Sequence, residues 1–172
     1  NSLYSNTTGA QNTAVGSLAL DANTTGAQNV AVGYSALTAV TTGNFNIAMG
    51  HEALKTITTG SNNVAIGQSA MDANTANDNT AVGHNALLAN STGNKQVAIG
   101  GTALDANTTG GSNTAVGYGA LSANTTANYN TAVGRDALLL NTTGTEQTAV
   151  GANALDANTT GTENTAFGFS AL

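Results

Sequence analysis

The sequence contains no cysteine, no proline and no tryptophan, and only 7% of its 172 residues are charged. Without cysteine there can be no disulfide, no thiolate catalysis and no cysteine–zinc site. Three basic residues against nine acidic ones argue against nucleic-acid binding, which requires clustered Lys and Arg. No apolar run approaches the roughly 18 residues that span a bilayer, so we expect no direct membrane insertion by this segment. Small residues dominate, which is untypical of a globular enzyme.

What the sequence does contain is a repeat of 17 residues. The motif N-T-A-V-G-S-L-A-L at 12–20 returns as N-V-A-V-G-Y-S-A-L at 29–37, and eight further copies follow. The step is 16 residues only once, from Asn63 to Asn79. A short fixed period indicates a solenoid. We therefore predict an all-β chain, a parallel β-solenoid or β-roll of ten repeats. It forms a single array over residues 1–172, and we expect this array to be a segment of a longer fibrous protein.

Each copy alternates a β-branched residue, an alanine and a large aliphatic residue, which is the period of a β-strand. We interpret the large aliphatic residue as facing inward, and the residue that closes each motif as a second core position. The first set, named the valine column, is Val15, Val32, Met49, Ile66, Val82, Ile99, Val116, Val133, Val150 and Phe167. The second set, named the leucine column, is Leu20, Leu37, Leu54, Met71, Leu87, Leu104, Leu121, Leu138, Leu155 and Leu172.

An amide side chain precedes every strand motif. This amide column is Asn12, Asn29, Asn46, Asn63, Asn79, Gln96, Asn113, Asn130, Gln147 and Asn164. Stacked coils would place these side chains about 4.8 Å apart, where amides can hydrogen-bond into a ladder. The remainder of each unit, such as D-A-N-T-T-G-A-Q at 21–28, is predicted to be an outer turn. Its glycine follows a threonine pair and suits a positive φ.

The sequence shows no constellation for chemistry, and we expect no catalytic, cofactor-binding or metal-binding residue. His51 and His84 share a position but lie two coils apart, too far to hold one metal ion. The aspartates of the turn half never fall on adjacent coils, and the calcium-roll signature is absent. Seven N-T-T or N-S-T sequons occur, beginning with Asn6 and Asn23. We interpret them as turn residues, although they would be glycosylation acceptors in a suitable secretory host.

The position after the strand glycine varies most in size and polarity. Such variation is typical of a surface position, and it is where we expect any contact with a surface receptor or host-cell ligand. The candidate residues of this contact column are Tyr34, His51, His84, Tyr118, Arg135 and Phe169. Tolerance of exposed positions is the alternative explanation.

The motifs N-N-V-A-I-G-Q-S-A at 62–70 and K-Q-V-A-I-G-G-T-A at 95–103 resemble the head repeats of trimeric autotransporter adhesins. The resemblance implies a left-handed β-roll and a homotrimer whose rolls pack side by side. Each predicted coil offers only two large aliphatic side chains, which independently favours association of several chains. The longer unit with N-T-T-G is also similar to repeats of phage-like tail fibres and bacterial surface proteins.

We therefore expect a non-enzymatic rod of an extracellular surface fibre or adhesin, which mediates or spaces attachment to cells or surfaces. The first alternative is a segment of a phage or phage-like tail fibre that contacts a host receptor. The second alternative is an ice-binding solenoid, because arrays of threonine can match ice.

Overall fold

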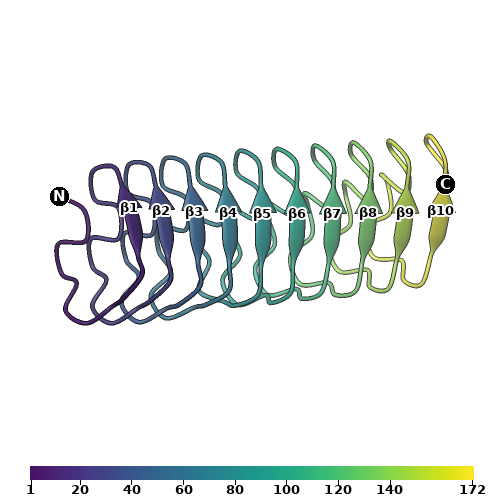
Figure 1. Cartoon of the computed structure of the whole chain (residues 1–172). Helices are drawn as coiled ribbons and strands as arrows, with labels where there is room; N and C mark the ends of the chain where they lie inside the picture. Colours follow the sequence, from purple (N-terminus) through teal and green to yellow (C-terminus); the bar gives the residue numbers. More distant parts are fainter.

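The computed structural model describes all 172 residues and contains ten three-residue strands and no helix. The strands recur once per repeat, and we call each repeat with its strand a rung. They are β1 (Thr13–Val15), β2 (Val30–Val32), β3 (Ile47–Met49), β4 (Val64–Ile66), β5 (Thr80–Val82), β6 (Val97–Ile99), β7 (Thr114–Val116), β8 (Thr131–Val133), β9 (Thr148–Val150) and β10 (Thr165–Phe167). Figure 1 shows them side by side along an elongated rod.

All ten strands form one parallel sheet in sequential order, so each coil pairs with the coil before and after it. Equivalent residues face each other, as in the pairing of Thr114 with Thr131. The one shorter repeat keeps this alignment, because Val64 still pairs with Thr80. The missing residue is absorbed outside the strands. The predicted parallel β-solenoid is therefore confirmed.

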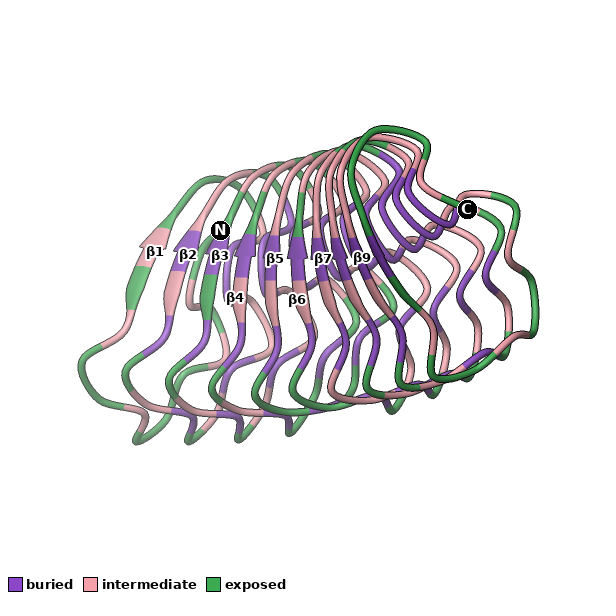
Figure 2. Ribbon diagram, turned by 90° about the vertical axis from the view of Figure 1, so that its right-hand side faces the viewer, coloured by how far each residue is buried: buried purple, intermediate pink, exposed green.

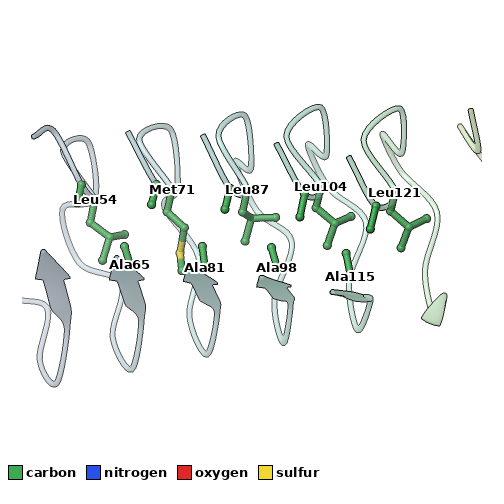
Figure 3. Close-up of a cluster of buried hydrophobic side chains, with 14 of the residues drawn as sticks. Leu54, Ala65, Met71, Ala81, Leu87, Ala98, Leu104, Ala115 and Leu121 are labelled. Carbon is green, nitrogen blue, oxygen red and sulfur yellow. The ribbon is translucent and has the colours of Figure 1, made fainter. Parts of the chain in front are cut away.

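The interior of the coil is narrow and holds one side chain of the leucine column at each level. Nine members of the leucine column, from Leu20 to Leu155, are buried as predicted, and Leu121 is completely inaccessible, whereas the terminal Leu172 is 83% exposed. Opposite it lies the middle residue of each strand, an alanine such as Ala115, which is also inaccessible. Figure 3 shows the side chains of the leucine column pointing toward the labelled strand alanines. These two sets form the apolar core.

The predicted inward orientation of the valine column is wrong. The alternation along each strand has the opposite phase: the alanine points inward and its two neighbours point outward. The reason is volume, because the leucine column fills the coil and leaves room for only a methyl group on the strand. The corrected residues, which lie half-buried or exposed on the outer side of the sheet, are Val15, Val32, Met49, Ile66, Val82, Ile99, Val116, Val133, Val150 and Phe167.

Each rung turns its corners with residues in the left-handed conformation, which few non-glycine residues adopt. Three positions per rung do so. In the seventh rung they are Ser112 (φ 57°), Gly119 (φ 66°) and Leu121 (φ 53°). Because the leucine position is left-handed, the two neighbouring residues Ala120 and Leu121 can both point into the core. The strand glycines are positive as well, with φ +142° at Gly117.

The glycine after each threonine pair was predicted to have a positive φ, and this is wrong for Gly110 and its equivalents. A Cβ atom at Gly110 would meet the backbone oxygen of Ala127 on the next rung. Glycine is therefore used there because two backbones approach closely. The equivalents covered by this correction are Gly9, Gly26, Gly43, Gly60, Gly93, Gly144 and Gly161.

The amide column is buried between the two ends of the rod and ties consecutive rungs together. The side-chain oxygen of Asn113 accepts a hydrogen bond from the backbone N–H of Asn130 (2.9 Å). Its Nδ2 donates to the carbonyl oxygen of Ala127 (2.8 Å). The ladder therefore joins amide to backbone at most rungs. Direct amide–amide bonds appear at two steps, from Asn46 to Asn29 (3.2 Å) and from Asn63 to Asn46 (3.1 Å).

Candidate functional site

All six candidate residues of the contact column lie exposed on one side of the rod. Each follows a strand glycine whose positive φ turns the chain away from the sheet, as at Gly117 before Tyr118. The column therefore runs along one border of the outer face of the sheet. Figure 2 shows this face with the strands in the middle and the loops on either side.

Neighbouring residues of the contact column touch at one place. The rings of Tyr34 and His51 stack with their centroids 5.3 Å apart. Arg135 instead contacts its own rung, with Nε 3.5 Å from Asp136 Oδ2, and donates to Asn153 Oδ1 on the next rung (3.4 Å). His84 and Phe169 have no such partner among the ion pairs and stacked rings. The column is a row of separate side chains with one stacked pair.

Beside this stacked pair lies the one charge cluster of the third and fourth rungs. Lys55 Nζ donates a hydrogen bond to Glu52 Oε1 (2.8 Å), which lowers the pKa of Glu52 and raises that of Lys55. His51 Nδ1 lies 3.7 Å from Glu52 Oε2. Burial raises the pKa of Asp72, whose Oδ1 atom is inaccessible and has no hydrogen-bond partner.

The surface has no pocket, and no group of three or more His, Cys, Asp or Glu residues lies close enough to hold a metal ion. No helix could cross a membrane. A partner would therefore have to bind the exposed side chains along the rod and not a cavity.

A second ladder, which the sequence analysis did not find, runs through the asparagine of the N-T-T-G turns. We name its positions the inner asparagine column. Asn124 donates from Nδ2 to Asn107 Oδ1, and Asn107 donates likewise to Asn90 (both 2.9 Å). These three sequon asparagines are fully buried. Their amides are engaged inside the rod and are closed to glycosylation in the folded chain.

The inner asparagine column is interrupted at two rungs, where Val40 and Ile57 occupy it. The Oδ1 atom of Asn23 is buried there without a partner, because the next rung offers Val40 instead of an amide donor. The buried column could have been recognised from the sequence by these two residues, because valine and isoleucine in place of asparagine indicate a buried position.

A further surface feature is the outer face of the sheet. It consists of the valine column and the β-branched residue that opens each strand, as in Val97 and Ile99 of β6. Within the rod, Met49, Ile66 and Ile99 keep 42%, 38% and 40% of their surface accessible. The chain thus displays on its surface the apolar residues that the sequence suggested were its core.

The fold places the chain in the class of parallel β-solenoids. No family model matches the sequence, and no curated protein and no solved structure resembles it at a significant level.

Proposed function

We propose that this chain is a non-enzymatic structural and adhesive rod of an extracellular surface fibre or adhesin. Three parallel copies would pack along a common axis, with the outer faces of their sheets turned toward one another. The observation that carries the proposal is the valine column, which forms an apolar row along the outer face through all ten strands. The left-handed roll and the homotrimer are the arrangement that the resemblance to trimeric autotransporter heads implies.

The distribution of charge supports burial of this face against other copies. None of the three basic and nine acidic side chains lies in a strand. They lie on the borders of the face and beyond, as do Lys95 before β6 and Arg135 after β8. An apolar centre surrounded by a charged rim is the usual anatomy of a protein interface. A contiguous row of exposed apolar side chains is a common mark of an interaction surface.

The single coil also has little core of its own. Because the valine column lies outside, most rungs bury one large aliphatic side chain, such as Leu104, together with alanines and amides, and only Val40 and Ile57 add a second. Association would bury the valine column as a shared second core. The resulting rod would be stiff, and repeating weak contact sites on three chains would strengthen attachment.

Mass measurement in solution tests the assembly. We expect the mass of three chains, and a stable monomer would overturn the proposal. Val116→Asp should lower the mass toward one chain, because association would bury an unpaired carboxylate on every copy. Thr126→Asp, on the turn side, is the matched control and should leave three chains. Retention of the trimer by Val116→Asp would show that the outer face is not the interface.

The flanking sequence distinguishes an adhesin from the alternative tail fibre. A membrane-anchor barrel after this segment indicates an adhesin, whereas a chaperone or baseplate-attachment domain indicates a tail fibre.

One observation favours ice binding as a second candidate. The second threonine of each pair is exposed, and its hydroxyl makes no hydrogen bond within the chain. These residues are Thr8, Thr25, Thr42, Thr59, Thr92, Thr109, Thr126, Thr143 and Thr160. The whole turn side, 22–27 and its equivalents, carries no charge. Thermal hysteresis of the chain that Thr109→Lys abolishes would support this function, and its absence would refute it.

A further inference from the structure

Two exposed columns border the outer face of the sheet. The contact column follows each strand. The other column, named the leading column, stands two residues before each strand in the left-handed conformation. Its members are Gln11, Gln28, Phe45, Asn62, Asp78, Lys95, Ser112, Tyr129, Glu146 and Glu163. Phe45 and Tyr129 are 54% and 65% exposed, although both are aromatic.

Symmetry determines which borders would meet if three copies pack with their outer faces inward. A cyclic arrangement is heterologous, so one border of each copy faces the opposite border of the next copy. When the symmetry axis runs along the rod, equivalent rungs lie at the same level. The leading column of one copy therefore faces the contact column of its neighbour, rung by rung.

At three levels the facing residues are complementary in chemistry or size. Tyr129 meets Arg135, an aromatic ring against a guanidinium group. Asp78 meets His84, a carboxylate against an imidazole. The long side chain of Lys95 meets Gly101, where there is no side chain to obstruct it. No like charges oppose each other between the two columns at any rung.

We propose that these same-rung pairs form the three seams between copies, with Tyr129 of one chain packed on Arg135 of the next. This inference rests on the three-chain assembly proposed above, and its occupant is a second copy of this chain. It assigns to Arg135 and His84 a role in holding copies together, in place of the receptor contact predicted for the contact column. The exposed aromatic residues of the leading column then have a partner surface.

The same pair cannot meet within one chain. Tyr129 lies two residues before β8 and Arg135 two residues after it, so the extended strand between them holds their Cα atoms on the order of 15 Å apart. A disulfide requires Cα atoms within about 7 Å. Any disulfide between these two positions would therefore join different chains.

The absence of natural cysteine allows a clean cross-linking experiment. The variant Tyr129→Cys with Arg135→Cys should yield a covalent trimer under mild oxidation, seen on a non-reducing gel. Each single variant should stay uncross-linked, because equivalent positions do not face each other across a three-fold seam. Tyr129→Cys with His84→Cys, three rungs out of level, is the control and should also stay uncross-linked.

A second cysteine pair tests the geometry of the seam without removing the contacts that are proposed to stabilise it. Glu146→Cys with Ala152→Cys removes none of the contacts proposed above and should cross-link in the same way. If the reduced proteins have the mass of three chains and neither pair cross-links, the seam assignment is wrong while the trimer stands. If they are monomers, the proposed assembly itself fails. Cross-linking of a single variant would indicate two-fold pairing and overturn the inference.

Discussion

The two sides of the β1–β10 sheet differ in how much their residues vary along the rod. On the inner side every rung carries the same residue, alanine, in all ten strands. On the outer side the valine column varies among valine, isoleucine, methionine and phenylalanine, and the β-branched column varies as well. The inner side faces a filled coil of fixed width, so its volume cannot change. The outer side has no such restriction within one chain. Uniformity along the repeat therefore marks the core more reliably than side-chain size does.

The largest effect that this comparison predicts comes from emptying the inner side. Leu121→Ala should destabilise the chain by about 2–5 kcal/mol, because it removes the one large side chain of its rung and leaves a cavity. Hydrogen exchange should show faster opening of the neighbouring rungs, since solenoid rungs couple mainly to their neighbours.

Val116→Ala is the matched control on the outer side of the same coil. Measured on single chains at high dilution, it should cost less than about 1 kcal/mol, because Val116 is only partly buried there. Equal losses from the two variants would contradict the assignment of inside and outside.

Overfilling the inner side is the next test. Ala115→Val adds two methyl groups where the leucine column already occupies the coil, and overpacking of this kind costs about 1–3 kcal/mol. The same enlargement on the outer side, Val116→Ile, should change chain stability by no more than about 0.5 kcal/mol. Thermal unfolding of the two variants measures the difference. A tolerated Ala115→Val would show that the coil interior is wider than the structure indicates.

The inner asparagine column extends the comparison to polar core residues. Val40→Asn alone would donate to Asn23 Oδ1 but leave its own Oδ1 atom facing Ile57, and Ile57→Asn alone would leave an amide N–H facing Val40. Each single variant should cost about 1–3 kcal/mol, because it replaces a buried aliphatic side chain with an amide that is not fully paired. Together they would join Asn23 to Asn74 by one continuous amide ladder. The double variant should therefore be more stable than the sum of the single losses predicts, by about 1 kcal/mol. Additive losses would show that the ladder contributes nothing.

The 17-residue period was sufficient to predict the strands and their alignment. Parallel coils of equal length force equivalent residues such as Thr114 and Thr131 to pair, and the shorter repeat could be placed in the turn half because the strand motif keeps its pattern. The leucine and amide columns followed from the same reasoning. The phase of the strand did not, because alternation shows that two sides exist and leaves open which one is buried.

The left-handed conformation at the corners of the coil could not be predicted from the sequence either. Leu121 and Tyr129 adopt positive φ although their side chains do not favour it, so tertiary packing of the coil overrides local preference. At the position of Gly119, the equivalents Asn85 and Asp136 gave a local signal, since Asn, Asp and Gly tolerate this conformation. The border columns of the candidate site could be identified as exposed, but their facing across copies requires the folded coil.

The smallest expected effect lies on the turn side, where adjacent threonines differ in their surroundings. Thr126 is exposed and its hydroxyl has no partner in the chain, so Thr126→Asp should change stability by no more than about 0.5 kcal/mol. Thr125 is half-buried, and its Oγ1 donates to the carbonyl oxygen of Thr142 (3.3 Å). Thr125→Val removes that donor while keeping the shape, and should cost about 0.5–1.5 kcal/mol. Chemical denaturation of both variants compares two neighbouring residues of the same type. If Thr126→Asp proved the more damaging, the turn side would contribute to the stability of the rod through contacts that a single chain does not make.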